Sequence, residues 1–128
     1  MTITGLYASL LFFLYFKLTR NVINLRKKIN IVLGDGKNQL LQMAMRAHGN
    51  FIEYVPMGLI LMGALELNKM NKLIVFVLGA FFLAGRIYHA ASLQKEININ
   101  FRIRGMKLTL YSMALMAGLN ILLFFVRI

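Results

Sequence analysis

The chain alternates between long apolar stretches and short basic segments. Four apolar stretches are readable, at residues 3–23, 38–68, 73–91 and 106–126. In the second of these the apolar body occupies residues 51–67, and a helical pattern begins earlier, near Asn38. A helix of about 20 apolar residues crosses a hydrocarbon core of about 30 Å, and no stretch shows the period-two alternation of a membrane β-strand. The pattern predicts an all-α integral membrane bundle with four spanning helices.

Composition narrows the class of protein. Of the 128 residues, 59% are hydrophobic and only 15% are charged, whereas a soluble domain carries about 25% charged residues. A soluble globular enzyme and a disordered chain are therefore excluded, and the length predicts one domain over residues 1–128. The sequence contains no cysteine, so a disulfide framework, a thiolate metal site and a cysteine nucleophile are excluded as well. Any sulfur chemistry must use sulfur that a ligand brings.

The net charge of +11 comes from basic residues gathered between the apolar stretches. The first connection and its flank hold six of them: Lys17, Arg20, Arg26, Lys27, Lys28 and Lys37. The third connection holds four: Lys95, Arg102, Arg104 and Lys107. Three basic residues lie at the opposite ends of the apolar stretches, in the second connection and after the fourth stretch: Lys69, Lys72 and Arg127. Because cytoplasmic loops carry the excess of Lys and Arg, we expect connections one and three in the cytoplasm and both termini outside. Attraction to an anionic leaflet accounts for the charge, so no nucleic-acid partner is expected.

Several polar residues lie inside the apolar stretches. Arg46, Asn50 and Glu53 are spaced i, i+4, i+7 and share one helix face. Arg86 and His89 are spaced i, i+3 and share a face of the third stretch. A charged residue at mid-bilayer costs about 2.5–3.5 kcal/mol on insertion scales. We therefore expect these side chains to face one another, a subunit interface or a water-filled site.

Two interpretations of this cluster remain open. One is structural: Arg46 or Arg86 forms an internal ion pair with Glu53 that holds the second and third helices together. The other is a ligand site, because two arginines and a histidine face one nearby glutamate, and Arg102 and Arg104 follow soon after. Such an excess of positive charge favours an anionic ligand, since the guanidinium fork matches carboxylate geometry.

The length of the second helix places this cluster near one membrane boundary. A helix over residues 38–68 is about 46 Å long at 1.5 Å per residue, longer than a hydrocarbon core of about 30 Å. Its first turns, with Arg46 and Asn50, are expected near the cytoplasmic boundary. Glu66 is expected near the same face, much further along. His48 lies off that face of the helix and is not expected to bind a ligand, and two histidines without suitable partners do not predict a metal site.

Four short motifs resemble one family. The run RAHGNFIEYVP at residues 46–56 resembles the helix-two signature R-x-x-x-N-x-x-E-x-x-P of the MAPEG family, the membrane-associated proteins of eicosanoid and glutathione metabolism. The run GRIYH at residues 85–89 looks like its third-helix motif. Basic runs at residues 25–28 and 102–106 resemble its two cytoplasmic segments, the second particularly in the small bacterial branch. The resemblance covers nearly the whole chain.

The resemblance implies a four-helix protomer that assembles as a homotrimer, with glutathione bound at each protomer interface. By position it assigns glutathione binding to Arg26 of the neighbouring protomer, Arg46, Asn50, Glu53, Arg86 and His89. Arg102 would lie near the thiol and stabilise the thiolate, with Arg104 as the alternative. The bacterial branch implies a multi-pass protein of the inner membrane, with its active site facing the cytoplasm.

The activity that this resemblance implies is a glutathione transferase, with glutathione peroxidase activity as an extension, acting on lipophilic electrophiles or lipid hydroperoxides. Glutathione would be the co-substrate, and no metal is implied. Two departures argue against prostaglandin synthesis: Leu93 replaces a tyrosine of many eicosanoid-type members, and Ile103 replaces a serine of the prostaglandin E synthase branch.

Two other functions remain open at this point. One family branch binds lipid without catalysis, so membership does not prove an enzyme. A small proton-coupled multidrug transporter could use Glu53 as its cation site, but the neighbouring arginines would repel a cationic substrate.

Overall fold

The computed structural model describes residues 1–93 and 98–127. This part of the chain forms four helices, α1 (Thr2–Ile29), α2 (Gln39–Leu67), α3 (Lys72–Ala91) and α4 (Ile99–Arg127). All four are long and apolar enough to span a membrane, which confirms the predicted all-α class. Lys95, counted above for the third connection, lies outside the described residues.

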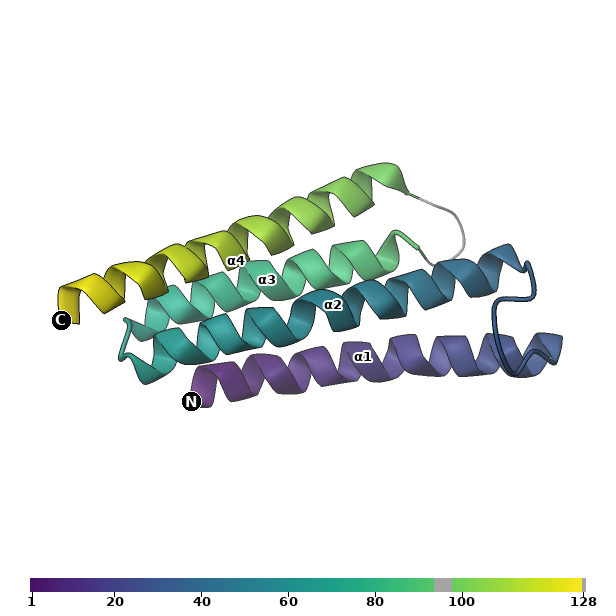
Figure 1. Ribbon diagram of the computed structural model, residues 1–128, viewed down its shortest axis with the longest axis horizontal. Helices are drawn as coiled ribbons and strands as arrows, with labels where there is room; N and C mark the ends of the chain where they lie inside the picture. Colours follow the sequence, from purple (N-terminus) through teal and green to yellow (C-terminus); the bar gives the residue numbers. More distant parts are fainter. Residues whose placement is uncertain (94–97, 128) are drawn as a thin grey trace.

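The helices run in alternating directions along one bundle axis (Figure 1). The N-terminus, the α2–α3 turn and the last residues of α4 lie at one end. The α1–α2 connection, the last turn of α3 and the first turn of α4 lie at the other end, which we call the connection end. Helices α2 and α3 pack against each other, and each of them also contacts α1 and α4. No contact joins α1 to α4 within the described residues. The central pair α2–α3 therefore forms the frame for any site at the connection end.

The basic segments turn out to be helical. Helix α1 continues to Ile29, six residues past the predicted span, and α4 begins at Ile99, seven residues before it. Lysine and arginine are good helix formers, and their long side chains reach water while the backbone stays hydrogen-bonded. Helix α3 is shorter: its 20 residues rise about 30 Å, close to the hydrocarbon thickness. Its length therefore matches a single crossing of the apolar layer.

Two glycines bring α3 and α4 into close contact near the connection end. A Cβ atom added to Gly85 would lie 2.8 Å from the backbone nitrogen of Thr109 and 2.9 Å from the carbonyl oxygen of Gly105. A Cβ atom added to Gly105 would lie 2.8 Å from the carbonyl oxygen of Gly85. Because these neighbours are backbone atoms, the approach requires glycine at both positions. It places the first turns of α4 directly against the last turns of α3.

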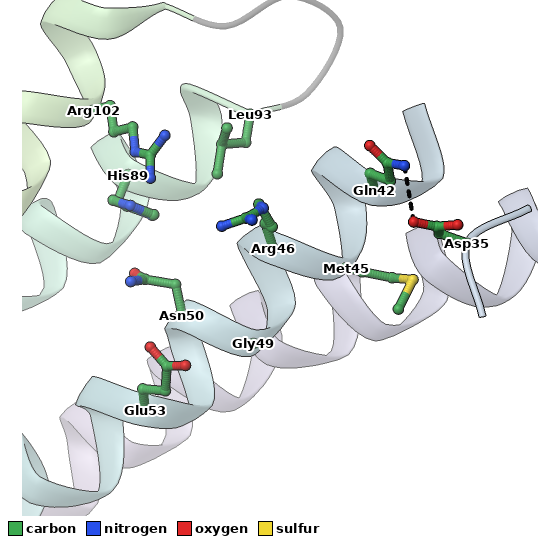
Figure 2. A pocket seen from close by; sticks show the side chains of 10 residues that line it. All are labelled: Asp35, Gln42, Met45, Arg46, Gly49, Asn50, Glu53, His89, Leu93 and Arg102. Carbon is green, nitrogen blue, oxygen red and sulfur yellow. Dashed lines mark hydrogen bonds between the residues drawn. The ribbon is translucent and has the colours of Figure 1, made fainter. Parts of the chain in front are cut away.

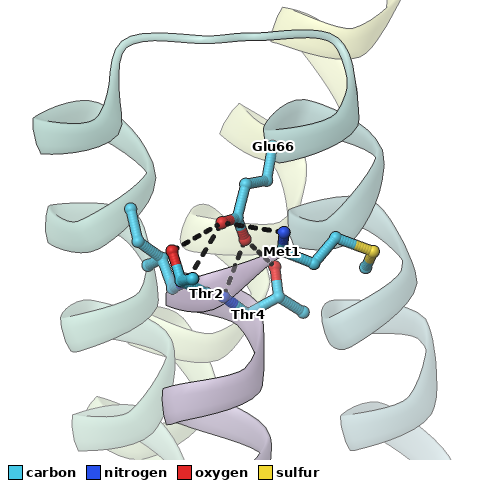
Figure 3. A network of polar contacts seen from close by, with 5 residues as sticks. Met1, Thr2, Thr4 and Glu66 are labelled. Atoms are coloured by element: carbon cyan, nitrogen blue, oxygen red, sulfur yellow. Dashed lines mark hydrogen bonds and ion pairs between the residues drawn. The ribbon is translucent and has the colours of Figure 1, made fainter.

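Glu66 lies at the opposite end and holds the start of α1 (Figure 3). Its carboxylate accepts hydrogen bonds from the backbone N–H groups of Ile3 (3.0 Å) and Thr4 (2.8 Å), and lies 3.5 Å from the Met1 amino group. The free N–H groups of a helix start attract such a carboxylate. The expectation that Glu66 shares a face with Glu53 is wrong, because thirteen residues at about 100° each place it about 220° away.

Candidate functional site

A cavity of about 620 Å³ opens at the connection end between α2, α3 and α4 (Figure 2). It brings together five of the residues proposed from the sequence: Arg46, Asn50, Glu53, His89 and Arg102. The remaining lining residues are Asp35, Gln42, Met45, Gly49 and Leu93. Polar side chains from three helices and one connection thus converge on one space.

Helix α2 supplies the charged wall of the cavity. Arg46 and Glu53 are exposed in the single protomer, and Asn50 is half-buried. Among the described residues the only ion pair joins Glu66 to the Met1 amino group. The predicted ion pair between Glu53 and Arg46 or Arg86 is therefore not formed in this protomer; Arg86 instead links α3 to α2 through hydrogen bonds to Asn50. The charges of α2 point into the cavity without neutralising each other.

Arg86 lies behind this wall. Its side chain is only 1% exposed, and its Nε donates a hydrogen bond to Thr109 Oγ1 at 3.1 Å. Its Nη1 donates to the backbone oxygen (3.3 Å) and the side-chain Oδ1 (3.0 Å) of Asn50. The guanidinium carbon lies 5.3 Å from the Tyr54 ring centroid, in cation–π range. Arg86 reaches the cavity through Asn50, and direct contact with glutathione stays a prediction.

The hydrogen bonds from Arg86 fix what Asn50 can offer a ligand. Its Oδ1 already accepts a hydrogen bond from the guanidinium. The carboxamide keeps its two N–H donors, and one acceptor position remains on Oδ1. Asn50 is therefore prepared to bind an acceptor, such as a peptide carbonyl or a carboxylate.

His89 and Arg102 form the opposite wall. Figure 2 shows both side chains directed into the cavity from α3 and α4, across from α2. Arg104 is exposed and does not line the cavity. Residues that are two positions apart in a helix point in directions about 200° apart. Arg102 and Arg104 therefore cannot point the same way. Of the two arginines proposed from the sequence, the geometry favours Arg102.

The mouth of the cavity carries two residues that sequence reasoning missed, Asp35 and Gln42. The Asp35 carboxylate accepts hydrogen bonds from the Lys37 backbone N–H (2.9 Å) and from Gln42 Nε2 (2.8 Å). These bonds, the one from Lys37 first, lower the pKa of Asp35. A lowered pKa means that these contacts order the connection above about pH 4 and are lost as the pH falls further. Gln42 could have been found, because it precedes Arg46 by four residues on the same face; Asp35 depends on the loop conformation.

Two further residues act within the protomer. Arg26 donates hydrogen bonds to the carbonyl oxygens of Val32 (3.1 Å) and Gly34 (2.9 Å) and does not line this cavity in its own chain. Its assignment to a neighbouring protomer stays a prediction. His48 Nε2 lies 3.1 Å from Thr19 Oγ1 on α1, and His48 does not line the cavity either. His48 therefore contacts α1 rather than this cavity.

Comparison with known proteins identifies similar sequences over nearly the whole chain. A profile of the MAPEG family matches residues 4–122. The inner membrane protein YecN of Escherichia coli strain K12 is 34% identical over 119 residues, which covers 93% of this chain and 90% of that protein. The protein of the same name from Escherichia coli O6:H1 strain CFT073 matches with the same identity and coverage. These names state a membrane location for the relatives and no activity.

Proposed function

Because this chain belongs to the MAPEG family, we propose that it is a membrane-bound glutathione transferase that conjugates glutathione to lipophilic electrophiles. One observation carries the proposal: a single cavity gathers Arg46, Asn50, Glu53, His89 and Arg102 with no ion pair among these residues. A glutathione peroxidase activity toward lipid hydroperoxides belongs to the same proposal. There the bound thiolate attacks a peroxide oxygen, the O–O bond breaks, and the lipid leaves as an alkoxide that water protonates to the alcohol. The sulfenic acid of glutathione then reacts with a second glutathione to give the disulfide and water.

The cavity suits glutathione in size and charge. Its volume of about 620 Å³ lies within the range of about 300–1,000 Å³ that is typical of ligand pockets. Glutathione carries two carboxylates, an ammonium group, two peptide groups and a thiol. Arg46 matches a carboxylate, Glu53 matches the ammonium group, and the N–H donors of Asn50 match a peptide carbonyl. The guanidinium of Arg102 is left for the sulfur.

Chemistry in this site needs the thiolate, because the thiol is a poor nucleophile. We propose that Arg102 stabilises the thiolate while the thiol proton leaves to water at the open cavity mouth. The sulfur then forms a bond with the electrophilic carbon, whose leaving group departs with its electron pair. Arg86 acts as a positioning residue, because its hydrogen bonds orient Asn50. The bilayer supplies the apolar electrophile from the side.

The proposal includes a homotrimer in which a neighbouring protomer completes each site with Arg26. Its support is the exposure of Arg46 and Glu53 in a single protomer. Charged side chains in a membrane helix that face lipid are costly. A neighbouring protomer would cover them and close the cavity around glutathione.

We also propose that the connection end faces the cytoplasm of a bacterium and that the protein lies in the inner membrane, where its relative YecN is named. The support is the excess of basic residues at the first and third connections. Alkaline phosphatase, which is active only outside the cytoplasm, is expected to be active when fused to the C-terminus. Green fluorescent protein at the same position is expected to be dark. Fluorescence with inactive phosphatase would reverse the orientation.

Purified protein in detergent is expected to conjugate glutathione to 1-chloro-2,4-dinitrobenzene, with chloride as the leaving group. The measured quantity is the rate of product formation above the uncatalysed reaction at the same pH. Saturable glutathione binding without turnover would indicate a non-catalytic binding protein of the family instead. Binding of lipophilic cations without glutathione binding would indicate a transporter that uses Glu53.

A further inference from the structure

A second cavity, of about 530 Å³, lies at the connection end between α1, α2 and α3. It shares only Leu93 with the candidate glutathione site. Ala90, in the last turn of α3, forms part of its wall. Since α3 is about as long as the hydrocarbon core is thick, this cavity lies where the apolar layer meets the headgroup layer.

One side of the cavity is a basic and amide-rich face of α1. Lys17, Arg20, Asn21 and Asn24 line it. Their spacing of i, i+3, i+4, i+7 places all four on one helix face, and all four are exposed. None of these side chains has a hydrogen bond or ion pair within the described part of the chain, although the Arg20 guanidinium lies 5.9 Å from the Phe16 ring centroid. The face therefore offers several unused donors and two positive charges.

The floor of the same cavity is apolar. Leu18, Ala47, Ala90 and Leu93 line it, and each is buried. The two alanines are small, so they leave space between the three helices. No acidic side chain is among the described residues that line the cavity. A basic rim above an apolar floor is complementary to an amphiphilic anion.

We propose that this cavity binds an anionic phospholipid from the surrounding leaflet. The phosphodiester would accept hydrogen bonds from Lys17 and Arg20, with Asn21 and Asn24 as further donors, and the start of an acyl chain would cover the apolar floor. Basic pockets between membrane helices are known to bind such headgroups. The two uncompensated charges favour a lipid with a net negative charge over a zwitterionic one.

The acidic residues of the chain argue against a second copy as the occupant. The Asp35 carboxylate is hydrogen-bonded to Lys37 and Gln42, and Glu66 is bonded to the start of α1 at the opposite end. Glu53 lies in the candidate glutathione cavity, and Glu96 lies outside the described residues. The described acidic residues are thus all engaged or placed elsewhere, whereas the leaflet supplies phosphate at the required depth.

Native mass spectrometry of the detergent-solubilised protein, titrated with phosphatidylglycerol or phosphatidylcholine of the same chain length, tests this site. The wild-type protein is expected to prefer phosphatidylglycerol. The double substitution Lys17→Gln and Arg20→Gln is expected to weaken that binding about 30-fold, because each of the two basic residues contributes about 1 kcal/mol near the surface and a factor of ten corresponds to about 1.4 kcal/mol. Binding of phosphatidylcholine should change less than twofold.

The matched control also removes two charges at the connection end, by Lys37→Asn and Lys107→Gln; asparagine tolerates the positive φ of Lys37. It should retain phosphatidylglycerol binding within about twofold, as should the charge-preserving exchange Lys17→Arg with Arg20→Lys. If phosphatidylglycerol binding weakens equally in the control and the test variant, the proposed lipid site is wrong, because only the general surface charge would then matter. Displacement of the lipid by inorganic phosphate alone would also contradict the proposal, because the cavity would then bind a soluble anion.

The affinity of the variants for glutathione should not change. This test is therefore separate from the transferase proposal.

Discussion

Replacing Arg102 by leucine is expected to remove most of the thiolate from bound glutathione at neutral pH. A free thiol with a pKa of about 8.5 is only about 3% ionised at pH 7. If the guanidinium stabilises the bound thiolate by about 2 kcal/mol, within the range for hydrogen bonds to charged groups, the ratio of thiolate to thiol rises about 30-fold. About half of the bound glutathione is then ionised. Arg102→Leu should return this fraction to a few per cent.

The measurement is the ultraviolet absorbance of the thiolate, titrated against pH with saturating glutathione. The cation favours the deprotonated form, so the wild-type midpoint is expected below that of free glutathione, and Arg102→Leu should raise it. Turnover at pH 7 should fall about tenfold, whereas the affinity for glutathione should fall only about twofold, because the thiol form binds without this contact.

Arg104→Leu is the matched control, because Arg104 lies on the same turn of α4 and points away from the cavity. Its titration and turnover should equal those of the wild type. If Arg104→Leu raises the midpoint and Arg102→Leu does not, the assignment of the arginine is wrong while the transferase proposal stands. An unshifted midpoint in the wild-type protein would contradict the enzyme and favour a binding protein.

Arg46→Ala is expected to weaken glutathione binding by about 10- to 100-fold. The reason is that a hydrogen bond to a charged group contributes about 1.5–3 kcal/mol, and Arg46 has no ion-pair partner within the described residues that would share its charge. Isothermal titration calorimetry in detergent measures the affinity. Because Arg46 is exposed in the protomer, the substitution should leave the helix content in circular dichroism unchanged.

Lys28→Ala serves as the control for this substitution. Lys28 is exposed at the same end of the bundle and lines neither the glutathione cavity nor the lipid cavity. It should bind glutathione as the wild type does. Equal affinity in wild type and Arg46→Ala would mean that the cavity does not use this charge for glutathione, and the proposed ligand would be wrong.

The sequence by itself determined the class of the fold and one wall of the site. Four stretches of apolar residues predict four helices, because a chain in lipid must satisfy its backbone hydrogen bonds within each helix. The face shared by Arg46, Asn50 and Glu53 followed from the period of the helix, and α2 runs unbroken through all three. Residues on one helix have fixed relative directions, so their spacing is sufficient.

Only the tertiary structure decided which residues meet across helices. That Arg86 orients Asn50, that Arg102 and not Arg104 faces the cavity, and that Asp35 lies at its mouth all depend on how the elements are rotated against each other. The Gly85–Gly105 approach sets this rotation for α3 and α4, and the hydrogen bonds of the connection set it for Asp35. The period of a helix gives directions around its own axis and carries no information on the axis of its neighbour. Contacts between helices therefore follow from packing, which no spacing along the chain specifies.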